Sequence, residues 1–480
     1  MLKRLVIAPL LLLTAAAAFA QVPPDRSTAP VPGPAPTLRL PAIHKRALSN
    51  GLPVWVVELH EVPVVQIGLV LLAGGNADPA GKFGLASMTS AMLDEGAGKR
   101  SALEIADAID YLGASLSTTS SFDAAAVRLW VPVSRLSQAL PVMADVVLRP
   151  TFPPEELERL RKERLTSMLQ ARDDPSSVAS LSFPKIVFGQ HRYGVSLAGT
   201  PTTVGAFSAE DVRAFYQSHY RPDAATLIVV GDVQADAVVA QLESAFGAWK
   251  PQGAVSPVNP PPSAPQLGAR QVYIIDKPGA PQSQIVIGAV GVARSTPDYF
   301  ALQVMNTVLG GSFTSRLNQN LREEHGYTYG AGSGFSMRLA PGPFQAQAGV
   351  QTEVTAEALK EFFNELNGIL KPVPADELAR AKNYVALGFP GEFETAAQIS
   401  ARLEELFVYK LPADYFERYV QNIQAVTAAD VQRVAQQYVV PGKFAVVVVG
   451  DRKTIEAPVR ALNLGPVQLM TVDEALGPAK

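Results

Sequence analysis

The histidines of this chain are the first residues to consider as metal ligands. There are five of them, His44, His60, His191, His219 and His325. No two lie three to five residues apart, and a helix presents two ligands on one face only at spacings of three or four residues. Cysteine is absent. The spacing therefore predicts no metal site in this chain, and the missing thiols exclude disulfides and cysteine-based metal centres.

Nucleophilic and phosphate-binding patterns are also missing from the sequence. A nucleophile elbow needs Gly-x-Ser-x-Gly, and Gly332-Ser333-Gly334 lacks that spacing. Gly310-Gly311 is followed by no Walker lysine, so nucleotide binding has no support. Residue types and spacing alone therefore do not indicate the function of the protein.

The composition indicates a folded protein that does not bind nucleic acid. Of 480 residues, 48% are hydrophobic and 18% charged, which is enough apolar material for large cores. The 41 basic residues are balanced by 44 acidic ones, giving a net charge of −3. Because no basic surplus is present to neutralise a phosphate backbone, nucleic acid is not expected as a partner.

The first twenty residues have the pattern of a secretory signal peptide. Lys3 and Arg4 precede an apolar run from Leu5 to Phe19, and Ala18-Phe19-Ala20 ends it with small residues around a cleavage site. The run is shorter than the ~20 residues that span a membrane. We therefore expect a signal peptide at 1–20, no membrane span after its cleavage, and secretion, into the periplasm if the source is a Gram-negative bacterium.

Two proline-rich stretches divide the remaining chain. Residues 21–37 predict an extended lead-in and residues 251–270 a linker, since segments so rich in proline do not pack as helices or central strands. The expected domains are therefore residues 38–250 and 271–470.

The two halves repeat one another. Asp211 and Asp430 lie 219 residues apart, and the same offset separates the glycines of two apolar runs that end in Gly-Asp, Gly231 and Gly450. A second pair of matching segments, Glu156-Leu157 and Glu377-Leu378, is separated by 221 residues. Two pairs of matching segments with nearly the same separation indicate that the halves arose by duplication.

Each half mixes strand and helix patterns in a similar order. The Ser101 to Glu104 segment is a capping box that opens a helix, and Val127, Leu129 and Val131 alternate as in a half-buried strand. We predict an α+β fold of two duplicated domains, each a mainly antiparallel sheet with helices on one face, joined by the proline-rich linker.

Several segments together match one protein family at suitable distances. They are Ala73-Gly74-Gly75-Asn76-Ala77-Asp78, Phe83-Gly84-Leu85-Ala86, Asp173-Asp174-Pro175, Leu309-Gly310-Gly311-Ser312-Phe313-Thr314-Ser315-Arg316-Leu317 and Leu321-Arg322-Glu323-Glu324-His325-Gly326-Tyr327-Thr328-Tyr329. Over about residues 40–460 the chain resembles the insulinase/pitrilysin family of zinc peptidases, the inverzincins, in their two-domain, half-sized form.

The resemblance implies a zinc site whose residues are replaced here. Active members carry His-x-x-Glu-His directly after the Gly-Leu-Ala segment and a third ligand, a glutamate, roughly 75 residues further on. The corresponding positions in this chain are Ser87, Ser90 and Ala91, followed by Ser167, or Met168 with a slip of one residue. By this resemblance the two histidine ligands, the general base and the distant glutamate are all lost, and the chain alone should not hydrolyse peptides.

The same resemblance assigns a role to Arg322 and Tyr329. In the family an arginine and a tyrosine seven residues apart face the zinc site, hold the substrate backbone and stabilise the oxyanion. A guanidinium suits carbonyl oxygens, and a phenol can donate to developing negative charge. Without the family context, an exposed arginine and a half-buried strand tyrosine would be the simpler interpretation.

These observations lead to one hypothesis and two alternatives. We expect the non-catalytic subunit of a secreted heterodimeric zinc metallopeptidase, with no cofactor of its own, in which Arg322 and Tyr329 act in trans on peptide substrates. The partner would be a homologous catalytic subunit that carries the zinc. The alternatives are a structural paralogue with no role in proteolysis and a peptide-binding or chaperone-like module.

Overall fold

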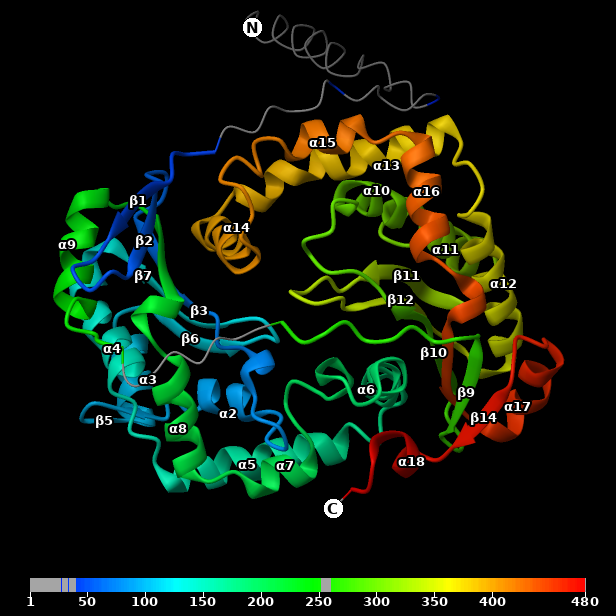
Figure 1. Ribbon diagram of the computed structural model, residues 1–480, viewed down its shortest axis with the longest axis horizontal. Coiled ribbons are helices and arrows are strands. Elements are labelled where there is room, and N and C mark those ends of the chain that lie inside the picture. The colour runs from blue at the N-terminus through cyan, green and yellow to red at the C-terminus, as the bar shows by residue number, and fades with distance from the viewer. Residues whose placement is uncertain (1–26, 28–32, 34–39, 252–259, 480) are drawn as a thin grey trace, which may run out of the picture. The chain divides into compact units, whose positions relative to one another are not determined.

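Two six-stranded sheets form the framework of the protein in a computed structural model, which describes residues 27, 33, 40–251 and 260–479 (Figure 1). The predicted signal peptide, the lead-in apart from Ser27 and Gly33, and linker residues 252–259 lie outside this described part. Within it, no helix is long and apolar enough to cross a membrane.

The first half contains one sheet with strand order β1-β2-β8-β3-β7-β6. Only the β2–β8 pair is parallel. The strands are β1 (His44–Ala47), β2 (Pro53–Glu58), β3 (Val64–Leu71), β6 (Ser115–Ser120), β7 (Ala125–Pro132) and β8 (Ala225–Gly231), and a short hairpin adds β4 (Gly96–Ala97) and β5 (Arg100–Ser101). The helices are α2 (Leu85–Ala91), α3 (Ala102–Tyr111), α4 (Leu136–Leu148), α5 (Pro154–Gln170), α6 (Pro175–Phe188), α7 (Pro201–Ala206), α8 (Ala209–His219) and α9 (Ala235–Phe246).

The second half repeats this plan with the order β11-β12-β10-β13-β9-β14. Its strands are β9 (Gln271–Asp276), β10 (Gln282–Val290), β11 (Thr328–Phe335), β12 (Pro343–Gln351), β13 (Ala445–Gly450) and β14 (Val467–Met470). The helices are α10 (Tyr299–Leu309), α11 (Arg316–Asn318), α12 (Thr355–Gly368), α13 (Ala375–Gly388), α14 (Ala396–Tyr409), α15 (Tyr419–Ala425), α16 (Ala428–Tyr438), α17 (Arg452–Ala461) and α18 (Val472–Leu476), with a π-helical turn, η6 (Gln319–Glu324), after α11.

The predicted repeat is visible in both topology and local chemistry. The parallel pair β2–β8 corresponds to β9–β13, and the edge strand β6 corresponds to β11. The helices α8 and α16 each begin with a capping box, Ser208 with Asp211 and Thr427 with Asp430. Because these boxes satisfy the first free N–H groups locally, the sequence alone places both helix starts.

The glycines of the two Gly-Asp ends are required by close packing. A Cβ atom on Gly231, whose φ is +150°, would lie 2.2 Å from the Val64 carbonyl oxygen. At Gly450 the added atom would lie 2.6 Å from Ser283 Oγ. Each strand end therefore approaches its neighbour too closely for any side chain.

Each half packs its own helices against one face of its sheet, as predicted. The first core lies between the sheet of the first half and helices that include α4, α8 and α9. The second lies between the sheet of the second half and helices that include α10, α12 and α16. The α+β class with two duplicated halves is confirmed.

The other face of each sheet receives a helix from the opposite half. Helix α14 packs on β3 and β8 of the first half, where Val70, Ile228 and Val230 join the core of the second half. Helix α6 packs on β10 and β13, and Phe183 and Val447 belong to the same hydrophobic cluster there. This exchange of helices joins the two halves into one compact unit over the described residues 40–251 and 260–479.

Candidate functional site

Helix α2 carries the first three positions of the degenerate metal motif. Gly84 precedes the helix in the left-handed conformation, with φ +96°, and a Cβ atom there would lie 2.6 Å from the Ala198 carbonyl oxygen. The Asp78 carboxylate accepts hydrogen bonds from the N–H groups of Gly84 and Ala86, both at 2.7 Å. These contacts satisfy donors that the helix itself leaves free.

Asp78 is held in turn by a buried arginine. Arg192 Nη2 lies 2.7 Å from Asp78 Oδ2, and its Nε donates to the Gly75 carbonyl at 2.8 Å. Burial raises the pKa of the Asp78 carboxyl, against the lowering effect of the Ala86 N–H and of Arg192. The motif segments around Gly75, Asp78 and Gly84 thus form one network that positions the start of α2.

The side chains at the former ligand positions do not fit zinc. Ser87 and Ala91 lie one helical turn apart and are both half-buried, while Ser90 is buried. Ser90 faces Tyr220 at the end of α8, and burial raises the pKa of the Tyr220 phenol, an effect that the Ser90 hydroxyl opposes. A zinc site needs imidazole, thiolate or carboxylate donors, and a methyl group with two hydroxyls supplies none.

Helix α5 carries the fourth position beside α2. Arg164 Nη2 lies 3.5 Å from the Ser87 carbonyl oxygen, so the side chain one turn before Ser167 reaches α2. Ser167 itself is exposed and Met168 is half-buried. Over the described residues, no three histidine or acidic side chains gather closely enough to hold a metal ion. The scaffold of the site is therefore present, but its donor set is not one for zinc.

Arg322 and Tyr329 lie on consecutive elements of the second half. Arg322 is in η6 and Tyr329 is in β11, the edge strand. The chain folds back between them, since the Tyr327 N–H donates to the Leu321 carbonyl at 2.9 Å and the Gly326 N–H to the Arg322 carbonyl at 3.1 Å. The seven-residue spacing of Arg322 and Tyr329 therefore spans the turn that connects η6 to β11.

A bulge in β11 directs Tyr329 into solvent. The pairing of β11 with β12 shifts register between Thr328 and Ala331, and Tyr329 is 93% exposed. The prediction of a half-buried strand tyrosine, which assumed no family context, is wrong, because the bulge removes this residue from regular pairing. Bulges commonly re-aim a side chain next to a functional site.

Arg322 has a local partner that sequence reasoning missed. Its guanidinium lies 4.7 Å from the centre of the Phe313 ring, and its Nε is 3.4 Å from Glu323 Oε1. Phe313 belongs to one of the segments that carry the family resemblance, so the sequence already marked it as a residue of interest. Its contact with Arg322 depends on how that segment folds, and residue spacing does not predict it. In the described part of the chain, no hydrogen bond, ion pair or ring contact joins Arg322 to Tyr329.

Comparison with known proteins identifies the same family over most of the chain. Residues 54–201 match the insulinase model of peptidase family M16, and residues 206–385 match the model of the peptidase M16 inactive domain. An uncharacterized zinc protease of Streptomyces coelicolor is 28% identical over 346 residues, which cover 71% of this chain and 74% of that protein.

Solved structures agree in fold. A peptidase M16 inactive domain from Pseudomonas fluorescens superposes with a TM-score of 0.78 at 27% identity, covering 85% of this chain and 98% of that one. A protease from Helicobacter pylori gives a TM-score of 0.80 at 21% identity, covering 86% of this chain and all of that one. With the motif segments assembled as described, this chain belongs to the insulinase-like peptidase family M16, as a two-domain, half-sized member.

Proposed function

We propose that this protein is the non-catalytic subunit of an exported heterodimeric zinc metallopeptidase, and that Arg322 and Tyr329 complete the active site of a zinc-bearing partner. The observation that carries the proposal is the contrast between two motifs of one family. The zinc motif on α2 and α5 has lost every donor, while Tyr329 remains and is 93% exposed on an edge strand.

The chemistry of the two side chains fits this role. The Arg322 guanidinium lies against Phe313, and its side chain is still 36% exposed, which leaves N–H groups for a substrate carbonyl. The Tyr329 phenol reaches solvent and can donate to an oxyanion as it forms. Zinc, supplied by the partner subunit, would activate the attacking water. The substrate would be a peptide bound between the two subunits.

The test uses the full chain mixed with a homologous subunit that carries His-x-x-Glu-His. Arg322→Ala and Tyr329→Phe should each lower kcat of the mixture by about 10²–10³, the usual cost of losing one oxyanion donor. Tyr111→Phe is the matched control, because Tyr111 is 83% exposed but lies on α3 in the other half.

Three outcomes would contradict parts of the proposal. Peptide hydrolysis by the chain alone would show that it is not a non-catalytic subunit. A mixture unaffected by both substitutions would point to a structural paralogue. Saturable peptide binding by the isolated chain, with no gain of hydrolysis in any mixture, would instead indicate a peptide-binding module.

A further inference from the structure

A groove runs along β11 and β12 on the sheet face opposite to the helices of the second half. It consists of two hollows of about 320 and 240 Å³, and both include Gly332 of β11 and Gln347 of β12. Helix α6 forms one wall of the larger hollow. Figure 1 shows α10 on one side of β11 and β12 and α6 on the other. The groove begins at Gly330, the residue that follows Tyr329.

The sequence of β12 gives this face its glutamines. Gln345 and Gln347 alternate with buried residues such as Ala346, which packs in the core of the second half. In the register of the sheet Gly332 lies opposite Gln347, and Gly334 lies opposite Gln345. Because opposite residues of two paired strands share a face, the floor of the groove is glycine on β11 and glutamine on β12.

The fold does not require glycine at the two ends of this floor. A Cβ atom on Gly334 would meet nothing within 4 Å, and one on Gly330 would meet only Asn318 Oδ1, at 3.8 Å. Neither glycine has a positive φ. Both therefore differ from Gly231 and Gly450, which close packing demands. Glycine inside a strand weakens it and often marks a place where a ligand or another backbone approaches closely.

The glutamine side chains of the groove have free hydrogen-bonding groups. The Gln284 amide lies over Gly349, where a Cβ atom would be 2.6 Å from its Nε2, and it forms no hydrogen bond with any described residue. Gln347 accepts one weak bond, from Gln345 Nε2 at 3.4 Å, and its own NH₂ group has no acceptor in the described part of the chain. Gln347 is exposed and Gln284 is half-buried, so a ligand in the groove can reach both.

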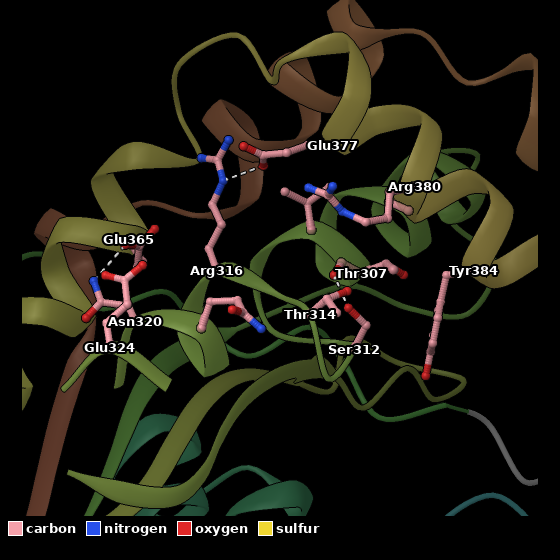
Figure 2. A pocket seen from close by; sticks show the side chains of 13 residues that line it. Thr307, Ser312, Thr314, Arg316, Asn320, Glu324, Glu365, Glu377, Arg380 and Tyr384 are labelled. Carbon is pink, nitrogen blue, oxygen red and sulfur yellow. Dashed lines mark hydrogen bonds and ion pairs between the residues drawn. The ribbon is translucent and has the colours of Figure 1, made fainter. Parts of the chain in front are cut away.

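The groove is uncharged, unlike the helix side of the same sheet. No acidic residue, lysine, arginine or histidine is found among the described residues that line it. Charged side chains gather instead in a cavity of about 350 Å³ between α10, α11, η6, α12 and α13, where Arg316 pairs with Glu377 and Asn320 donates to Glu365 (Figure 2). The groove therefore cannot select a ligand by its charge.

The outer edge of β11 is already occupied beside the groove. The Ala331 N–H donates to Asn318 Oδ1 at 3.2 Å, and the Ser333 N–H donates to the Gly310 carbonyl at 3.0 Å. Because these donors are taken, a peptide cannot add a strand to the sheet at these two positions. The face of the sheet remains available, and its carboxamides offer one acceptor and two donors each, the same groups that a peptide bond pairs with.

We propose that this groove binds an extended, unstructured polypeptide through its backbone, without selection for side-chain charge. The carboxamides of Gln284 and Gln347 pair with peptide N–H and C=O groups, and the glycines let the bound backbone lie close to the sheet. From Gly330 to Ser336 the groove accommodates about six residues of an extended chain. The inference rests on the proposed function in one respect, that the bound chain is the substrate, whose backbone then passes Tyr329.

The experiment measures the fluorescence anisotropy of labelled peptides mixed with the full chain alone. An uncharged peptide of serine, threonine and glycine is compared with versions that carry lysines or glutamates, and with a version whose alternate amides are N-methylated. We expect saturable binding with one site per chain and dissociation constants within about threefold for the three charge versions at physiological salt. N-methylation should weaken binding about tenfold or more, because it removes several N–H donors.

Substitutions in the groove separate this site from the rest of the surface. Gly334→Val fills the smaller hollow with a residue that strands favour and should abolish measurable binding. Gln284→Leu combined with Gln347→Leu removes both carboxamides at similar side-chain size and should weaken binding about tenfold. The matched control is Gln282→Leu combined with Gln351→Leu, which should leave binding unchanged. These two glutamines lie opposite each other on the same sheet face, outside both hollows.

Several results would overturn the proposal. They are no saturable binding of the uncharged peptide, equal binding of the N-methylated peptide, a strong preference for one charge, or equal losses in the two double variants. If Gly334→Val lowers the melting temperature, Gly330→Val, which fills the larger hollow, replaces it. The assay contains no partner, zinc or hydrolysis. A negative result therefore removes the groove and leaves the roles of Arg322 and Tyr329 intact, whereas inactive mixtures remove those roles and leave the groove.

Discussion

Arg128 and Glu404, 276 residues apart in the sequence, form a two-pronged ion pair across the two halves. Arg128 Nε donates to Glu404 Oε1 at 2.8 Å, and Nη2 to Oε2 at 2.5 Å. Arg128 is on β7 of the first half and Glu404 is on α14 of the second. The pair therefore ties the exchanged helix to the sheet that it covers.

Removing Glu404 should weaken this junction. We expect Glu404→Ala to lower the free energy of unfolding by about 1.5–3 kcal/mol, the range for hydrogen bonds to charged groups. Urea denaturation measures the change. Arg418→Ala is the control, since Arg418 and Asp414 form an exposed ion pair within a turn, which contributes only about 0.2–1 kcal/mol. Equal effects of the two substitutions would contradict the role of the junction.

Asp78 should be among the residues most sensitive to substitution in the first half. Asp78→Ala removes the acceptor for two N–H groups of α2 and leaves Arg192 buried without its counter-ion. Breaking a buried ion pair in this way costs about 3–5 kcal/mol. Thermal unfolding should show a large loss for Asp78→Ala and a smaller one for Asp78→Asn, which keeps an acceptor. A loss no larger in Asp78→Ala than in Asp78→Asn would argue against this network.

Asp123 should make the contact between the halves depend on pH. Its carboxylate accepts hydrogen bonds from the Leu339 N–H at 3.1 Å and the Tyr409 hydroxyl at 3.2 Å, both in the second half. Burial raises the pKa of the Asp123 carboxyl, although these two donors act to lower it. A raised pKa in the folded state means that the folded protein binds this proton more tightly than the unfolded chain.

The sign of the effect follows from that difference. The contribution of Asp123 to stability is fully present below the ordinary aspartate pKa and is lost as pH rises through its raised value in the folded protein. The stability of the parent protein relative to Asp123→Asn should therefore decrease from pH 4 toward neutral pH. Melting temperatures of the two proteins across this range measure it, and a constant difference would refute the prediction.

Restoring the donors should restore zinc binding. Ser87 and Ala91 are still one turn apart on α2, and the Arg164 side chain of α5 reaches the Ser87 carbonyl oxygen. We expect the variant Ser87→His, Ser90→Glu, Ala91→His, Ser167→Glu to bind one zinc ion per chain, because three protein ligands make a catalytic zinc site. Metal analysis after dialysis is the measurement. The same variant without Ser167→Glu is the control and should retain less zinc.

The sequence alone determined the features that depend on neighbouring residues. The capping box of Ser101 with Glu104 set a helix start, and the nearly constant offset between the halves revealed the duplication. The loss of zinc donors at Ser87, Ser90 and Ala91 also needed no structure, since it is a matter of residue type. Such signals are local, because a capping hydrogen bond spans three residues.

Only the tertiary structure decided how distant segments meet. The exchange of α6 and α14 between the sheets, the Arg128–Glu404 pair and the contact of Phe313 with Arg322 all depend on where the chain returns in space. The exposure of Tyr329 depends on a bulge against β12, and the cavity at Asn320 exists only once α10, α11, η6, α12 and α13 are in place. Burial and pairing are sums over contacts between remote residues, and residue spacing along the chain does not contain that information.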